Sequence, residues 1–89
     1  PPDYFMQELC TAFCDQGLSL LDVCLYYYTG CNKVLHIRFE NIKYRYLSQV
    51  KKRVEYLLAN LLPVDIDRVH VVQQTYGMAI QEFEYWGEY

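Results

Sequence analysis

Long apolar segments and clustered glycines are both missing from this sequence of 89 residues. No apolar run approaches the roughly 20 residues that span a bilayer, and no charged segment followed by an apolar one marks a secretory signal. The four glycines are isolated, which excludes a glycine-rich phosphate-binding loop. The chain does not start with methionine, and we expect it to be a fragment of a longer protein that carries any targeting signal.

Residue patterns typical of enzymes and metal centres are also missing. The serines and histidines form no nucleophile–base pair, and the histidines occupy polar positions of predicted strands, where we expect ordinary surface residues: Ser19, Ser48, His36 and His70. Two carboxylate pairs lack further partners and are expected to be solvated: Asp65 with Asp67, and Glu82 with Glu84. We therefore expect no enzymatic activity, no metal and no cofactor.

The cysteines lack the CxxC spacing of a structural zinc site; they are Cys10, Cys14, Cys24 and Cys31. Cys10 and Cys14 are four residues apart on a predicted helix, a geometry that seldom suits a disulfide. Cys24 and Cys31 flank a predicted turn, so a disulfide between them is one alternative. The favoured interpretation is that all four are small apolar packing residues.

What the chain does have is enough apolar material for one domain over residues 1–89, since 53% of the residues are hydrophobic and 17% are aromatic. Its charge is segregated. Residues 33–53 hold seven basic residues and one acid, a net charge of +6, whereas the remainder holds one base and ten acids, a net charge of −9. This predicts a basic face, which is either a solvated surface or a site for a polyanion.

Apolar spacing in the first half predicts a helix followed by two strands. Asp3 is expected to cap the helix, and Gly17, which adopts positive φ without steric cost, is expected to end it. Between them, apolar residues recur on one helical face: Phe5, Leu9, Ala12 and Phe13. Residues 20–28 are expected to form a strand, 29–32 a turn, and 33–40 a half-buried strand in which Leu35, Ile37 and Phe39 share one face.

The second half has the same plan. Ser48 is expected to cap a helix that Pro63 prevents from continuing, and strands over 64–74 and 78–86 follow. Its apolar stripe is Val50, Val54, Leu57, Leu58 and Leu61. Moving the first helix stripe by 45 residues reaches Val50, Val54, Leu57 and Leu58, and moving Val23 and Leu25 by 46 reaches Val69 and Val71.

We therefore predict an α+β fold in which helix, strand, strand occurs twice, over residues 3–41 and 47–86. Two helices would pack on one face of an antiparallel or mixed sheet of about four strands. The other face would carry polar and aromatic residues, namely Asp22, Cys24, Tyr26, Tyr28, His36 and Arg38. Strand order does not follow from these patterns.

Two sets of side chains are candidates for binding. The anion-binding candidates are Arg38, Lys43, Arg45, Lys51, Lys52 and Arg53. The stacking or interface candidates are Tyr26, Tyr28 and Tyr44. Aromatic and cationic side chains on one surface bind sugars, bases or protein partners, while the alternative for the tyrosines is cross-strand packing within the sheet.

The order of several short motifs resembles the periplasmic repeat domain of the YjbH family, bacterial outer-membrane proteins associated with exopolysaccharide production and secretion. The resemblance covers roughly residues 9 to 85 and rests on Gln16-Gly17, the strand through Val23 and Leu25, Phe39-Glu40-Asn41, Tyr44-Arg45, Arg53, Pro63 and Gly77. Lys51-Lys52 stand where that family often has small residues with glycine, so this helix is more basic. The duplicated helix–strand–strand pattern is also similar to BON-type domains, which are linked to phospholipid association.

The resemblance implies a periplasmic location, with attachment to the outer membrane through a parent that looks like a lipoprotein or a β-barrel protein. It implies a non-catalytic accessory domain that binds a partner protein, the barrel domain of its own parent or an anionic polysaccharide. The alternatives are a module that binds phospholipid surfaces and a structural spacer without a soluble ligand. Nucleic acid is disfavoured by the net charge of −3, and pairing through an exposed edge strand is a further option.

Overall fold

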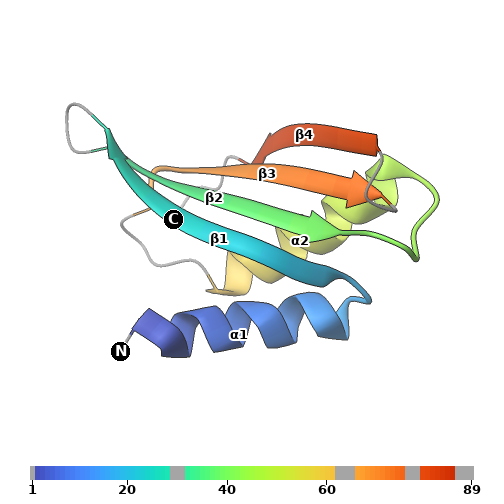
Figure 1. Ribbon diagram of the computed structural model, residues 1–89, viewed down its shortest axis with the longest axis horizontal. Helices are drawn as coiled ribbons and strands as arrows, with labels where there is room; N and C mark the ends of the chain where they lie inside the picture. Colours follow the sequence, from blue (N-terminus) through green and yellow to red (C-terminus); the bar gives the residue numbers. More distant parts are fainter. Residues whose placement is uncertain (1, 29–31, 62–65, 76–78, 86–89) are drawn as a thin grey trace.

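In the computed structural model, described backbone covers residues 2–28, 32–61, 66–75 and 79–85, and described side chains cover residues 4–27, 33–61 and 66–74. The elements follow in the order α1 (Pro2–Asp15), β1 (Ser19–Tyr28), β2 (Asn32–Glu40), α2 (Leu47–Leu61), β3 (Arg68–Thr75) and β4 (Ala79–Tyr85) (Figure 1). The predicted α+β class is thereby confirmed. The residue-by-residue correspondence between the two halves stays a prediction.

The strands form one mixed sheet of order β1-β2-β3-β4. Antiparallel hairpins join β1 to β2 and β3 to β4, whereas β2 and β3 are parallel. A parallel pair needs a crossover connection, and α2 supplies it. The central pair therefore brings together two segments from opposite halves of the sequence.

Helix α1 ends as the glycine predicts. Gly17 adopts φ of 78°, and its N–H donates to the carbonyl of Cys14 at 2.9 Å, while the N–H of Leu18 donates to the carbonyl of Phe13 at 2.9 Å. These two bonds are the Schellman motif, which satisfies carbonyls that the helix leaves without partners. The helix begins at Pro2, one residue before the predicted cap Asp3, whose side chain lies outside the described residues.

Helix α2 begins at Leu47, so the prediction that Ser48 caps it is wrong. Instead, the side-chain oxygen of Gln49 accepts the backbone N–H of Tyr46 at 3.2 Å. A glutamine at the third helical position that reaches back in this way is half of a capping box. The described helix ends at Leu61; Pro63 and the turn at Tyr76-Gly77 lie outside the described residues.

Both helices cover the same face of the sheet (Figure 1). The predicted stripes meet the alternating residues of the central strands there, and the buried members include Leu9, Phe13, Leu35, Ile37, Phe39, Val50, Val54, Leu57, Leu58, Val69 and Val71. The rings of Phe13 and Phe39 lie 5.4 Å apart between α1 and β2. Each such side chain contributes about 1.5–3 kcal/mol when it is fully buried.

Strand β1 departs from simple alternation. Its pairing with β2 shifts between Leu20 and Asp22, which leaves Leu21 as the extra residue of a β-bulge. The bulge allows Leu20 and Val23 both to pack against the core although they are three residues apart. Leu21 and Leu25 are 44% and 43% exposed, because β1 forms the edge of the sheet.

In the second half, the first strand begins later than the sequence predicts. The predicted strand over 64–74 begins at Arg68, and Ile66 and Asp67 precede it as irregular structure. The backbone N–H of Asp67 donates to the carbonyl of Lys33 at 2.9 Å, and its carboxylate accepts the N–H of Lys33 at 2.6 Å. These bonds continue the contact between the two halves beyond the start of β3.

Candidate functional site

Asn41 organises the turn between β2 and α2. Only 3% exposed, it donates its backbone N–H to the carbonyl of Gln74 at 2.9 Å. Its side-chain amide donates to the side-chain oxygen of Gln73 at 3.0 Å and to the carbonyl of Tyr44 at 2.9 Å. Its side-chain oxygen accepts the N–H groups of Lys43 and Tyr44 at 3.0 and 2.8 Å. These bonds fix the turn on β3 and direct Tyr44 toward α1.

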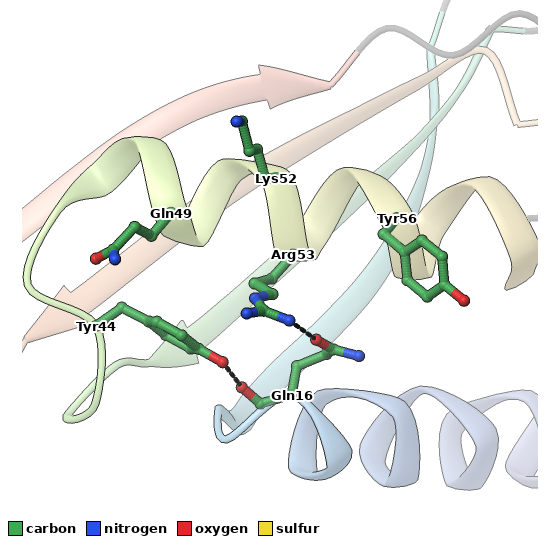
Figure 2. Close-up of a pocket in the computed structure, with 6 residues that line it drawn as sticks. All are labelled: Gln16, Tyr44, Gln49, Lys52, Arg53 and Tyr56. Carbon is green, nitrogen blue, oxygen red and sulfur yellow. Dashed lines mark hydrogen bonds between the residues drawn. The ribbon is translucent and has the colours of Figure 1, made fainter.

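Tyr44 joins this turn to the C-terminal end of α1. Its hydroxyl donates to the carbonyl of Gln16, a group at the end of the helix that has no partner within the helix (Figure 2). Arg53 from α2 lies 5.5 Å from the centroid of the Tyr44 ring and donates to the side-chain oxygen of Gln16 at 3.4 Å. The ammonium group of Lys43 lies 5.4 Å from the same ring. Two cations near the negative end of the helix dipole stabilise this junction.

An open cleft of about 550 Å³ lies at the junction. It is lined by two tyrosines, two cations and two side-chain amides: Tyr44, Tyr56, Lys52, Arg53, Gln16 and Gln49 (Figure 2). Tyr56 is 67% exposed at one end, and the ammonium group of Lys52 points away from Gln16 at the rim. No carboxylate is among these lining residues, so the charged groups that line the cleft are both cations.

The composition of the cleft suits a flat ligand with hydroxyl and carboxylate groups. Aromatic side chains offer apolar faces with a polar end, and side-chain amides both donate and accept hydrogen bonds. The guanidinium of Arg53 has five N–H donors in a planar array that matches a carboxylate. Within the described part of the chain, the Arg53 guanidinium makes one hydrogen bond, to the side chain of Gln16.

Comparison with known proteins identifies the family. The family model YjbH, described as an exopolysaccharide biosynthesis protein, matches residues 7–88, nearly the whole chain. The chain belongs to the YjbH family. No curated protein and no solved structure matches, and similarity to BON-type domains stays a prediction from the sequence.

Several of the short motifs that resemble the YjbH family meet at one place in the structure. Gln16-Gly17 end α1, Asn41 builds the turn, Tyr44 closes it on α1, and Arg53 stacks on Tyr44. Their positions in the sequence are far apart, yet they form one contact network between α1, the turn and α2. Several of the family's motif residues therefore have a structural role in this chain, beside any role in binding.

The six predicted anion-binding residues do not all lie on one side of the sheet. Lys52 and Arg53 line the cleft, and Lys43 lies beside it over Tyr44. Lys51 is exposed on α2, and the guanidinium of Arg45 lies 5.7 Å from the ring of Tyr46. Arg38 lies on the sheet face opposite the helices, where it donates to the side-chain oxygen of Gln74 at 3.2 Å. The prediction of a single basic face is wrong for Arg38, which lies on the other side of the sheet from the cleft.

The predicted stacking residues are divided in the same way. Tyr44 belongs to the cleft, whereas Tyr26 lies on the opposite sheet face with its ring edge against His36, at 4.8 Å and 82°. The backbone of Tyr28 pairs with Asn32, and its side chain lies outside the described residues.

Sequence reasoning missed Gln16, Gln49 and Tyr56 as cleft residues. A signal for two of them exists in the sequence. Gln49, Arg53 and Tyr56 recur at spacings of four and three residues on α2, which places them on one outward stripe. Gln16 had no such signal, because it reaches the cleft only when α1 packs beside α2.

The histidines are not the separate surface residues that their polar strand positions predict. His36 and His70 are both half-buried, and their Nδ1 atoms lie 3.3 Å apart. Burial, and then the neighbouring charge of His70, lower the pKa of His36. The pair depends on the parallel register of β2 and β3, which the sequence patterns did not predict.

The cysteine predictions are corrected as well. Cys10 and Cys14 are exposed, because each follows a buried residue of the α1 stripe by one position. They are therefore not packing residues. Cys24 is a half-buried thiol on β1. Cys31, its partner in the alternative disulfide, lies outside the described residues, so that alternative stays a prediction.

Proposed function

We propose that this domain is a non-catalytic accessory module that binds an acidic segment of an exopolysaccharide in the cleft between α1 and α2. The proposal includes a periplasmic location and attachment to the outer membrane through a longer parent chain. It rests on one observation above all: the cleft combines two tyrosines, two cations and two amides, with no carboxylate among its lining residues. The exopolysaccharide description of the family agrees with such a ligand.

Arg53 is the central residue of the proposal. It is held in place by the ring of Tyr44 and by Gln16, so a carboxylate ligand meets a guanidinium that is already oriented. A preorganised cation loses less conformational entropy on binding than a mobile lysine does. Tyr56 extends the site as an exposed ring one helical turn away.

A binding role suits the cleft better than glycosidic cleavage. Hydrolysis of a glycosidic bond commonly uses two carboxylates on either side of the bond. The cleft residues hold a ligand through cations, amides and rings, and they include neither a carboxylate nor a nucleophile paired with a base.

An NMR titration with a galacturonic acid tetramer tests this proposal, with a neutral hexose tetramer of equal length as the comparison. We expect the acidic tetramer alone to shift amides around the cleft. Arg53→Gln should weaken binding at least about tenfold, the effect of losing a charge-assisted hydrogen bond. Tyr56→Ala should weaken it without disturbing the Tyr44–Gln16 contact.

Arg45→Gln is the matched control, because Arg45 also stacks on a tyrosine but lies outside the cleft lining. It should change the affinity less than about twofold, because Arg45 is exposed, does not line the cleft, and acts on a ligand there only through a charge that water and salt screen. Equal losses in Arg45→Gln and Arg53→Gln would indicate general charge attraction and overturn the site. Binding to anionic vesicles only would favour the phospholipid alternative, and no binding to either probe would favour the structural spacer.

A further inference from the structure

The only two histidines of the chain lie next to each other although 34 positions separate them in the sequence. His36 on β2 is the register partner of His70 on β3. Register partners on neighbouring strands project from the same face of a sheet. Here that face is the one opposite the helices, where His36 and Arg38 line an open hollow of about 360 Å³.

The distance between the Nδ1 atoms of the two rings matches the distance between two nitrogen ligands of one metal ion. Their Nδ1 atoms are 3.3 Å apart, and the rings meet at 74°. Two nitrogens bound tetrahedrally to one zinc ion at 2.0–2.1 Å stand about 3.3–3.4 Å from each other. A hydrogen bond between two ring nitrogens at the same distance would be longer than the usual range.

We propose that His36 and His70 form a two-histidine site for a divalent transition-metal ion, bound through both Nδ1 atoms. Water completes the coordination, because no group of three His, Cys, Asp or Glu side chains in the described part of the chain is arranged to hold a metal. The ring of Tyr26 packs edge-on against His36 and restricts its orientation.

The donor set and the surroundings define the class of metal. Imidazole nitrogens suit zinc, copper and nickel, whereas magnesium and calcium prefer oxygen ligands. The same row of the sheet continues to Cys24 on β1 and to Glu84 on β4, the register partners of the two histidines. Arg38 on the same face adds positive charge, which further disfavours a cation held by electrostatic attraction alone.

The test is a titration of the full chain with ZnCl₂, compared with MgCl₂, followed by NMR and by the melting temperature. Because exposed Cys10 and Cys14 are also potential zinc ligands, both the parent and the variants carry Cys10→Ser and Cys14→Ser. We expect zinc, and not magnesium, to shift resonances around His36 and His70. Zinc should also raise the melting temperature, since the two histidines are brought together by the folded β2–β3 pair and zinc therefore binds the folded state more tightly.

His36→Asn and His70→Asn should each lower the zinc affinity at least about tenfold, because the remaining histidine binds without its chelate partner. Cys24→Ser should retain the affinity of the parent. Unchanged zinc affinity in both histidine variants, or no zinc binding by the parent, would overturn the proposal. Circular dichroism shows whether each variant folds. If a histidine variant does not fold, the proposal is decided by the chain with both histidines: zinc, and not magnesium, must shift the resonances around His36 and His70. The site lies on the face away from the cleft, so its failure leaves the glycan proposal untouched.

Discussion

The first strand of each half has the same place in the order of elements, yet the two strands have different surroundings. β1 lies at the edge of the sheet, where Val23 is partly buried and Leu25 is 43% exposed. β3 lies in the interior, where Val69 and Val71 are fully buried. The sequence patterns that relate these residues are alike, so the difference arises from the neighbours. Similar strand patterns therefore do not imply similar contributions to stability.

The strongest test of the contact between the halves is Asn41→Ala. This substitution removes the side-chain bonds that hold the β2–α2 turn to Gln73 and Tyr44, and it leaves buried polar groups without partners. We expect the free energy of unfolding to fall by about 3 kcal/mol in urea denaturation. Asn60→Ala, the same change at an exposed helical position, should cost less than about 0.5 kcal/mol. Equal effects would show that the turn does not join the halves.

Val23 and Val69 occupy corresponding positions in the sequence patterns of the two halves, so replacing each of them compares how much an edge strand and an interior strand contribute to stability. Val69→Ala should lower the free energy of unfolding by about 2 kcal/mol, because it opens a cavity at a fully buried position. Val23→Ala should cost less than about 1 kcal/mol, since water already reaches that strand. Urea denaturation of both variants gives the difference, and a larger loss at Val23 would contradict the edge assignment.

Substitutions of Gly17 test how α1 ends before the chain enters the edge strand β1. Its φ of 78° is unfavourable for a residue with a Cβ atom, and an added Cβ would lie 2.6 Å from Cδ of Lys43. Gly17→Ala should cost about 1–2 kcal/mol in thermal or urea unfolding. Gly17→Asn should cost less, because asparagine tolerates the left-handed conformation better. An alanine variant as stable as the parent would be incompatible with this helix end.

The smallest expected effect is the pH dependence of stability that arises from His36, at the contact between β2 and β3. The groups around His36 are Cys24 on β1, His70 on β3, and Tyr26 and Arg38 on the same face. Because the pKa of His36 is lowered in the folded state, the unfolded chain binds more protons in the window below its ordinary pKa of about 6.5. Stability should therefore fall as the pH drops from about 7 through that window.

Urea midpoints between pH 7 and 5, in the presence of a chelator, measure this dependence. His36→Asn should show a flatter profile than the parent. His70→Asn should raise the pKa of His36 in an NMR titration, because it removes the repulsive charge but not the burial. Identical profiles in the parent and His36→Asn would contradict the assigned direction.

Much of the fold was predictable because it depends on local patterns. The stripes of α1 and α2, the alternation in β2 and the glycine at the end of α1 are short-range signals, and the structure confirms them. The bulge at Leu21 was not predictable from simple alternation. It lets Leu20 and Val23 both face the core although they are three residues apart in the sequence. The cleft was predictable only in part, since Lys52, Arg53 and Tyr44 are basic or aromatic residues near each other in sequence, whereas Gln16 comes from another helix.

The sequence by itself determined which segments become helices and strands, which faces of them are apolar, and where α1 stops. Those properties follow from side-chain spacing and from glycine's access to positive φ. Only the tertiary structure decided that β2 pairs with β3 in parallel, which brings His36 to His70. Pairing between strands depends on how the whole core closes, and no local pattern encodes the partner of a strand.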